Sequence, residues 1–380
     1  MTFEPGSPSA PPAAAPAPAP APAAAPPSWP LQRFGKHWGL RRLADANGCF
    51  SMVAIDQRPP IVQCVARARD IAPEAVAFDD IVQVKALLAQ ALAPHASALL
   101  VDPDFGLPAA APHLNPARGL VITLEEHRYD DRLDGRLSRL IPHWSVAQIR
   151  RLGADAVKLL AWYRPDASAE VRQHQQQLVR TVGRACAEHD IAFVFELLVY
   201  PFAQRPGGAA KAAPNYDEDA AKQPRLVIDS VRDFAHASYG IDLFKLESPL
   251  PMATLPAPGS AGADAVQRLY DEMGQACAGT PWVMLSAGGS QQSFEHAITY
   301  ACRAGASGFL AGRAVWWDAL AAYPNAGAVA QALQQQAVPY LQRLRDTVAR
   351  EAHPWRVPVS FDGVTAEGQV CTARSAALVA

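Results

Sequence analysis

The sequence predicts a closed (β/α)8 barrel, an α/β TIM barrel, preceded by a disordered Pro/Ala-rich tail. From Gly48 onward, short apolar runs alternate with amphipathic stretches of about 12 to 20 residues, as in repeated βα units on a parallel sheet. Eight such runs over about 270 residues fit a closed barrel better than an open sheet. Several runs end in a charged residue, and active sites of barrels gather where the strands end.

The predicted strands are short and apolar. They span residues 50–56, 98–102, 120–125, 156–160, 192–197, 243–246, 282–286 and 308–311. Amphipathic stretches predict helices at 79–93, 146–152, 169–189, 225–236, 263–277 and 291–304. The alternative fold is a doubly wound sheet, which needs a Gly-rich first turn, but Gln57-Arg58-Pro59-Pro60 follows the first strand.

Three segments are predicted along the chain. Residues 1–30 hold 11 of the 34 prolines and one charged side chain, so they cannot build a core and form an extended tail. Residues 31–325 form the barrel, and residues 326–380 form a C-terminal helix and an irregular tail. Within the barrel, residues 205–222, rich in Gly, Ala, Lys and Asp, are expected to form a mobile loop over the mouth.

Composition and charge argue against a nucleic-acid-binding, membrane or secreted protein. The 380 residues carry a formal net charge of -2 with no basic block, so a nucleic-acid partner is not expected. Outside the tail, no apolar segment approaches the length that spans a bilayer, and a charged secretory start is absent, so we expect a cytoplasmic protein without a membrane partner. The six cysteines lack CxxC pairing, which favours free thiols. Homo-oligomerisation is left open.

Two lysines lie in apolar, strand-like runs: Lys158 in Ala156-Val157-Lys158-Leu159-Leu160 and Lys245 in Leu243-Phe244-Lys245-Leu246. Arginine outnumbers lysine 28 to 6, so a lysine kept in such a run indicates a need for an amine. An amine that is desolvated near another cation loses its proton more readily and can attack a carbonyl to form a Schiff base. The alternative for either lysine alone is a snorkelling side chain or a structural ion pair.

Carboxylates also fall at the predicted strand ends. Asp56, Asp102, Glu125 and Glu196 each close or approach the end of a strand, and their convergence on one rim favours a catalytic site over separate ion pairs. Glu196 stands between Phe195 and Leu197, so we expect burial to raise its pKa toward neutrality, which suits proton transfer.

Glycine-rich turns after the last two strands predict an anion site. Ser286-Ala287-Gly288-Gly289-Ser290 leads into a helix, and Gly308 to Gly312 is followed by Arg313, so backbone N–H groups and a guanidinium can meet a phosphate. The alternative is an ordinary Gly turn before a Ser-capped helix. The residues that we expect to bind substrate or phosphate are Gln57, Arg58, Ser286, Gly288, Gly289, Gly312 and Arg313.

A metal site is not predicted, because the ten histidines show no HxH or HExxH spacing. A metal-dependent lyase on the same barrel is therefore disfavoured, and we expect neither a metal nor another cofactor. A non-catalytic barrel that binds a sugar phosphate stays open, because a site kept for binding resembles one kept for turnover.

Six motifs together resemble the class I tagatose 1,6-bisphosphate aldolase family, whose relatives include the sulfofructose-phosphate aldolases. They run in the family's order from about residue 48 to 320 and read Ala54-Ile55-Asp56-Gln57-Arg58, Leu100-Val101-Asp102-Pro103-Asp104-Phe105-Gly106-Leu107-Pro108, Gly153-Ala154-Asp155-Ala156-Val157-Lys158-Leu159-Leu160, Phe244-Lys245-Leu246-Glu247, Leu285-Ser286-Ala287-Gly288 and Gly312-Arg313-Ala314. The resemblance implies a barrel that cleaves a ketose phosphate to dihydroxyacetone phosphate and an aldehyde without a metal.

The resemblance also assigns roles. Lys245 would be the Schiff-base lysine, and Lys158 the second lysine, which acts on it through charge and helps to dehydrate the carbinolamine. Glu196 and Asp56 would transfer protons. Glu125 is a weaker candidate, because Glu126-His127-Arg128 departs from the family pattern on the aldehyde side of the substrate.

Overall fold

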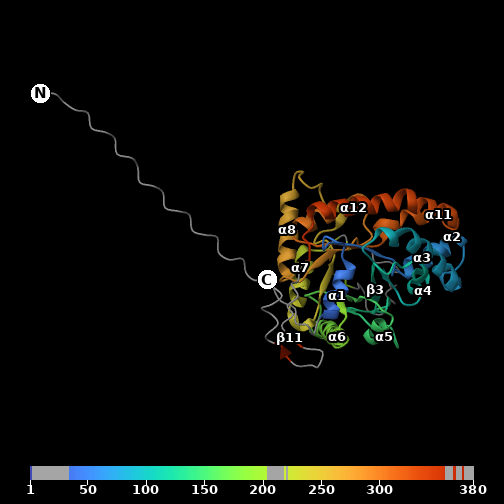
Figure 1. The fold of residues 1–380 in the computed structure, drawn as a ribbon, viewed down its shortest axis with the longest axis horizontal. Helices are drawn as coiled ribbons and strands as arrows, with labels where there is room; N and C mark the ends of the chain where they lie inside the picture. Colours follow the sequence, from blue (N-terminus) through green and yellow to red (C-terminus); the bar gives the residue numbers. More distant parts are fainter. Residues whose placement is uncertain (2–33, 203–217, 220, 356–362, 365–369, 372–380) are drawn as a thin grey trace.

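A computed structural model describes Met1 and residues 34–202, 218–219, 221–355, 363–364 and 370–371 (Figure 1). Apart from Met1, the tail predicted over residues 1–30 lies outside the described residues, and so does most of the loop predicted at 205–222.

Eight parallel strands close into a barrel, which confirms the predicted fold class. The strand order is β1-β10-β9-β8-β7-β6-β3-β2, and β1 pairs with both β10 and β2. Closure excludes the doubly wound alternative. The strands are β1 (Phe50–Ala54), β2 (Ala98–Val101), β3 (Gly119–Thr123), β6 (Ala156–Trp162), β7 (Ala192–Leu198), β8 (Leu243–Leu246), β9 (Trp282–Met284) and β10 (Gly308–Ala311).

Alternate residues of each strand point into the barrel, because successive side chains of a strand lie on opposite faces. An interior cluster of apolar side chains, which includes Met52, Val121, Val194 and Leu243, fills the space between the strands. The outward residues, such as Phe195, pack in a second cluster beneath the helices.

Helices surround the barrel, and several begin at the side-chain caps that the sequence offers (Figure 1). Ser145, Ser168 and Ser290 each accept a hydrogen bond from a backbone N–H in the first turn of the helix that follows. The predicted helices are present as α3 (Phe78–Leu92), α5 (Val146–Arg151), α6 (Ala169–Glu188), α7 (Pro224–Phe234), α8 (Ala263–Ala276) and α9 (Gln291–Arg303). Their ends agree with the prediction to within the usual one or two residues.

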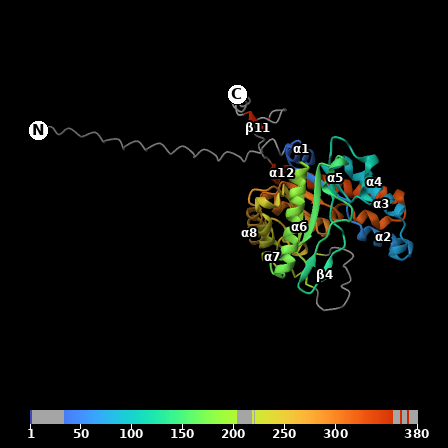
Figure 2. The ribbon, with the colours of Figure 1, turned by 90° about the horizontal axis from the view of Figure 1, so that it is seen from below.

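The described residues also contain further α-helices and strands. They are the helices α1 (Phe34–Leu43), α2 (Pro59–Arg69), α4 (Gly106–Ala110), α10 (Arg313–Trp316), α11 (Ala326–Ala332) and α12 (Val338–Glu351), and the paired strands β4 (Asp130–Arg132) with β5 (Gly135–Leu137) and β11 (Gly363–Val364) with β12 (Val370–Cys371). Figure 2 shows α1 at one end of the barrel and the β4 hairpin at the other. Leu40 and Leu43 of α1 join the interior cluster, so α1 closes the end opposite the hairpin.

The segment after β10 packs on the barrel. Helix α12 lies against α9, and Trp355 stacks on Phe50 at the start of β1 with ring centroids 6.2 Å apart. The division at residue 325 stays a prediction. Among the described residues, the longest helices are too short or too polar to cross a bilayer.

Candidate active site

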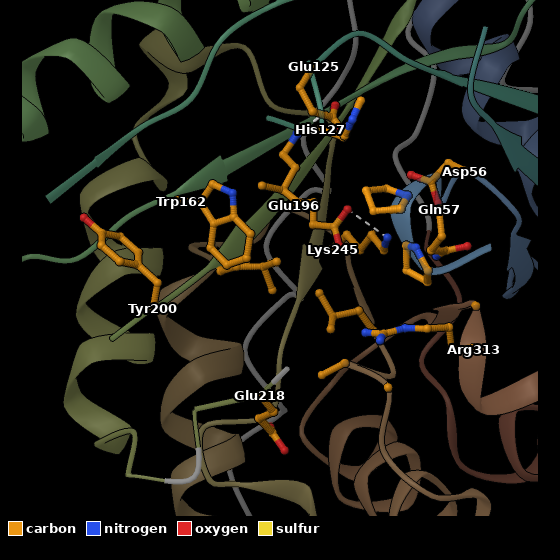
Figure 3. A pocket seen from close by; sticks show the side chains of 18 of the residues that line it. Asp56, Gln57, Glu125, His127, Trp162, Glu196, Tyr200, Glu218, Lys245 and Arg313 are labelled. Atoms are coloured by element: carbon orange, nitrogen blue, oxygen red, sulfur yellow. Dashed lines mark hydrogen bonds and ion pairs between the residues drawn. The ribbon is translucent and has the colours of Figure 1, made fainter. Parts of the chain in front are cut away.

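A cavity of about 490 Å3 opens at the carboxyl ends of the strands (Figure 3). That volume is in the range of sites that take a small ligand. The cavity is lined by the predicted site residues Asp56, Gln57, Arg58, Glu125, Lys158, Glu196, Lys245, Ser286, Gly288, Gly312 and Arg313, but not by Gly289 or Asp102. The alternation of strands explains this convergence, because Lys158, Glu196 and Lys245 continue the same inward faces as Ala156, Val194 and Leu243.

Contrary to the expectation, Asp102 does not join the other three carboxylates. It is 0% exposed, forms an ion pair with the buried Lys85 and accepts hydrogen bonds from the backbone N–H groups of Phe105 and Gly106.

The amine of Lys158 lies inside a cage of three carboxylates. Its Nζ is 3.1 Å from Asp56 Oδ2, 2.5 Å from Glu125 Oε1 and 2.7 Å from Glu196 Oε2. Thr123 Oγ1 donates to Asp56 at 3.2 Å, and the Leu160 N–H donates to Glu125 at 3.1 Å, so the cage is held from two neighbouring strands. All four charged side chains of the cage are at most 9% exposed.

Lys245 is joined to this cage through one shared oxygen. Its Nζ lies 2.9 Å from Glu196 Oε2, the atom that also contacts Lys158 (Figure 3). Glu196 and Lys245 are register partners on β7 and β8, so the contact follows from strand pairing. The two lysines singled out in the sequence therefore flank a single carboxylate.

Burial and charge compete at Lys158 and Asp56. Burial disfavours the ammonium of Lys158, but Glu125, Glu196 and Asp56 outweigh it and raise the pKa of Lys158 well above its ordinary value. Burial likewise disfavours the ionised form of Asp56, yet Lys158 and Lys245 hold the pKa of Asp56 well below its ordinary value. Both groups therefore stay charged through the physiological pH range.

The expectation of a raised pKa at Glu196 is wrong. Burial alone acts in that direction, but the ammonium groups of Lys158 and Lys245 outweigh it and lower the pKa of Glu196. The carboxylate of the cage whose pKa is raised is Glu125, because the effect of burial there exceeds that of Lys158, which contacts its Oε1. With three carboxylates and two ammonium groups, the cluster has a formal charge of -1, and Glu125 is the site best suited to hold an extra proton.

The glycine-rich turns bring Ser286, Gly288, Gly312 and Arg313 to one wall of the cavity. Gly288 has φ +77°, which favours glycine, and a Cβ there would lie 2.7 Å from Nη2 of Arg313, so a larger residue would displace the guanidinium. The Gly312 N–H is 3.4 Å from Ser286 Oγ. This wall offers a guanidinium, a hydroxyl and backbone N–H groups to an anion.

Gly289 lies behind this wall. Its N–H donates to the Ser286 carbonyl at 2.8 Å and closes the turn, and a Cβ there would meet Met252 Sδ at 3.1 Å. The prediction that Gly289 contacts phosphate stays a prediction.

Gln57 and Arg58 follow the end of β1, which pairs with β10 on one side and β2 on the other. The Gln57 amide packs against Gly312, where a Cβ would lie 2.6 Å from Nε2. Arg58 donates from Nη2 to the Glu125 carbonyl oxygen at 3.1 Å, and its Nη1 is 3.5 Å from Asp104 Oδ2. Arg58 therefore supports the backbone at Glu125 while it lines the cavity.

Several cavity residues were not predicted from the sequence. They are Glu126, His127, Tyr129, Arg136, Trp162, Tyr200, Glu218 and Asp219. The β4–β5 hairpin carries Arg136, and its Asp134-Gly135 dipeptide is a hairpin signal that could have located it. Trp162 was missed because β6 continues two residues beyond the predicted end at Leu160.

His127 is neutral at the mouth of the cavity. Burial, together with the nearby charge of Arg58, lowers the pKa of His127 to about 4. Its Nδ1 lies 2.6 Å from Glu126 Oε1. No group of three or more His, Cys, Asp or Glu side chains in the described part of the chain has the arrangement of a metal site.

Comparison with known proteins gives the family. The model of the DeoC/LacD family aldolases matches residues 50–318. The chain is 31% identical over 325 residues to tagatose 1,6-diphosphate aldolase 1 of Streptococcus mutans, covering 83% of this chain and 96% of that protein. It is 31% identical over 336 residues to tagatose 1,6-diphosphate aldolase 2 of Enterococcus faecalis, covering 86% and 98%.

Solved structures share the barrel. The crystal structure of an archaeal fructose 1,6-bisphosphate aldolase aligns with a TM-score of 0.51 at 16% identity, over 82% of this chain and 98% of that chain. A structure from a study of the Schiff base-forming fructose-1,6-bisphosphate aldolase gives the same values. At this identity the likeness concerns the fold, and the family follows from the sequence matches. The chain belongs to the DeoC/LacD aldolase family, in agreement with the resemblance in its motifs, and it is a carbon–carbon lyase.

Proposed function

We propose that this aldolase works through a Schiff base at Lys245 and cleaves a ketose 1,6-bisphosphate, such as tagatose 1,6-bisphosphate, to dihydroxyacetone phosphate and an aldehyde. The observation that carries the proposal is the position of the Lys245 amine, 2.9 Å from a buried carboxylate and on the wall of the cavity. The similarity to tagatose 1,6-diphosphate aldolases supports the substrate class.

The first step activates the amine. A proton passes from the Lys245 ammonium to Glu196 Oε2, which leaves a neutral amine and a neutral carboxylic acid in contact. Lys158 keeps its charge during this transfer because its pKa is raised. The neutral amine then attacks the ketone carbon and forms a carbinolamine.

The next steps use the same proton. Glu196 returns it to the carbinolamine hydroxyl, which leaves as water, and the nitrogen becomes an iminium ion. A carboxylate, Glu196 or Asp56, then removes the proton of the C4 hydroxyl. The C3–C4 bond breaks, its electrons pass to the iminium nitrogen, and an enamine and an aldehyde result. Protonation at C3 and hydrolysis release dihydroxyacetone phosphate and the free lysine.

The wall formed by Ser286, Gly288, Gly312 and Arg313 is proposed to hold the phosphate next to the ketone. This wall follows β9 and β10, and barrels frequently bind phosphate after these last two strands of the barrel. The strand order places Lys245 on β8, beside β9, so one ligand can contact both. Glu125 is proposed to hold a proton in the resting cluster.

We also propose that the enzyme acts in the cytoplasm. Cys49, Cys64, Cys186, Cys277 and Cys302 are free thiols, as a reducing compartment would keep them.

Trapping the Schiff base tests the mechanism. The protein is incubated with dihydroxyacetone phosphate and borohydride, and digested for peptide mass analysis. One reduced ligand is expected on the peptide that contains Lys245. Lys245→Arg should abolish both trapping and cleavage, because arginine keeps its proton and cannot attack a carbonyl.

Lys36→Arg is the matched control. Lys36 is also a buried lysine in an ion pair, 2.6 Å from Asp242, but it does not line the cavity. It should leave trapping at Lys245 intact in the folded protein. A labelled lysine other than Lys245, or active enzyme that is not labelled at all, would refute the proposal.

A further inference from the structure

Arg136 is held in the cavity wall by three aromatic rings. Its Cζ lies 3.8 Å from the ring centroid of Tyr129, 4.5 Å from that of Trp162 and 4.7 Å from that of Tyr200. These rings come from three separate stretches of the chain: the start of the hairpin, the end of β6 and the segment after β7. We call Tyr129, Trp162 and Tyr200 the Arg136 cage.

Further contacts fix the guanidinium. Nε and Nη2 of Arg136 donate to the two carboxylate oxygens of Asp131, at 2.9 and 3.2 Å. The backbone N–H of Arg136 donates to Tyr200 Oη at 2.8 Å. The preceding Gly135 has φ +153°, and a Cβ there would lie 2.7 Å from Val171. The side chain is therefore rigid, and Arg136 is 7% exposed where it lines the cavity.

An arginine with a purely structural role would not need to line the cavity. Arg164 is built in the same way: its Nε and Nη2 each donate to Asp166 at 2.8 Å, and its Cζ lies 4.1 Å from the ring centroid of Phe202. Arg164 does not line the cavity. Arg136 and Arg164 thus have similar settings, but of this pair Arg136 is the one that lines the cavity.

The topology puts Arg136 across the mouth from the proposed phosphate wall. In the closed order of strands, β10 and β6 are four positions apart and so lie on opposite sides of the barrel. Arg313 follows β10, whereas the Arg136 cage includes Trp162 at the end of β6. Figure 3 shows Trp162 and Tyr200 on one side of Lys245 and Arg313 on the other.

We propose that Arg136 binds a tetrahedral oxyanion, a phosphate or a sulfonate, at the end of the substrate remote from the ketone. This inference rests on the proposed function. A ketose whose ketone reaches Lys245 and whose first phosphate meets Arg313 extends its far end toward the opposite wall. A preorganised guanidinium there gives charge-assisted hydrogen bonds to an oxyanion and selects substrates that carry one. After the C3–C4 bond is cleaved, this oxyanion remains attached to the aldehyde product.

The test compares three substrates: a ketose 1,6-bisphosphate, the 6-sulfo ketose 1-phosphate and the ketose 1-phosphate with a neutral 6-hydroxyl. Wild-type enzyme should prefer an anionic far end. Arg136→Met should lower kcat/KM for the preferred anionic substrate by about ten-fold to a hundred-fold, the usual size of a lost charge-assisted contact. Cleavage of the neutral ketose 1-phosphate should change by less than about three-fold. The anionic substrate that loses more identifies the group that Arg136 recognises.

Two variants serve as controls. Arg136→Lys keeps the charge without the planar fork and should fall between wild type and Arg136→Met. Because Nη1 of Arg164 donates to the Tyr200 carbonyl oxygen at 2.7 Å, a different arginine serves as the second control. Arg42→Met removes an arginine that is paired with Asp155 outside both the cavity and the Arg136 cage, and it should leave the ratio of kcat/KM between anionic and neutral substrates unchanged.

Three results separate the outcomes. Equal losses on all three substrates in Arg136→Met would make Arg136 a structural residue and overturn the inference. A wild-type enzyme with no preference for an anionic far end would also overturn it, and that measurement needs no variant to fold. Borohydride trapping with dihydroxyacetone phosphate lacks the far end altogether, so it should persist in Arg136→Met; its absence in wild type would instead refute the Schiff-base proposal.

Discussion

Replacement of Lys158 by methionine tests the charge cage most directly. From the sequence alone the substitution is expected to be tolerated, because methionine keeps the apolar stem. The three carboxylates around Nζ change that expectation. After Lys158→Met, Asp56, Glu125 and Glu196 stay buried, and Lys245 contacts only Glu196.

The size of the effect follows from the uncompensated charge. Removal of one partner from a buried ion pair costs about 3 to 5 kcal/mol, and here three contacts are lost at once. The carboxylates can limit the cost by taking up protons. We therefore expect the free energy of unfolding at pH 7 to fall by about 3 to 5 kcal/mol, together with the loss of turnover.

The contribution of Asp56 and Glu196 to the pH dependence of stability should also reverse in sign, whereas that of Glu125, whose pKa is already raised in wild type, keeps its sign. In wild type, the pKa values of Asp56 and Glu196 are lowered by the lysines, so their contribution is present above the unfolded pKa near 4 and is lost as pH falls. In Lys158→Met the folded protein binds protons at these carboxylates more tightly than the unfolded chain does. Its stability should therefore rise as pH falls from 7 to 5.

Urea denaturation followed by circular dichroism at pH 7 and pH 5 measures both effects. The double variant Lys158→Met/Glu125→Gln removes one of the stranded carboxylates and should recover part of the loss. Lys36→Met removes the ammonium from a single buried carboxylate, Asp242, which still accepts a hydrogen bond from the Phe193 N–H, so it should destabilise the fold without the larger pH effect. A Lys158→Met protein within about 1 kcal/mol of wild type at both pH values would refute the reasoning, since that is below the cost of a broken buried pair.

Three further predictions concern the site. Arg313→Ala removes a charge-assisted contact that contributes about 1.5 to 3 kcal/mol. The dissociation constant for dihydroxyacetone phosphate, measured by calorimetry, should therefore rise by about ten-fold to a hundred-fold. An unchanged dissociation constant would show that Arg313 does not bind the phosphate. Activity should survive prolonged chelation with EDTA, whereas a loss that zinc or manganese restores would favour a metal-dependent lyase. Since its pKa is lowered to about 4, His127 should be neutral above pH 5, and an NMR titration of its imidazole that finds a midpoint near 6.5 would contradict the burial described here.

The fold could be predicted from the sequence because barrel strands and helices are encoded by local patterns. The eight apolar runs correspond to the eight barrel strands, and the amphipathic stretches between them correspond to α3, α5, α6, α7, α8 and α9, six of the α-helices in the described residues. The β4–β5 hairpin was not predicted, because strands of three residues are too short to show an alternation of apolar and polar side chains.

A lysine in an apolar run is not by itself a specific signal of a Schiff-base site. The five described lysines, Lys36, Lys85, Lys158, Lys222 and Lys245, are all buried and all contact a carboxylate. Burial of an amine therefore did not by itself mark the site. What separates Lys158 and Lys245 from the others is that they line the cavity, and that position depends on where their strands end relative to one another.

The sequence by itself determined which residues face inward, because side chains alternate along each strand and this period of two is a property of the backbone. Only the tertiary structure decided which inward residues meet. Register set Glu196 beside Lys245, closure of the barrel brought Lys158 among three carboxylates, and the hairpin carried Arg136 to the cavity. The direction of the pKa shift at Glu196 depended on those distances. Desolvation follows from burial alone, which the sequence pattern predicts, and it raises the pKa. The Coulomb interaction with the lysines lowers the pKa, and its size depends on distances in space between residues that are far apart in the sequence.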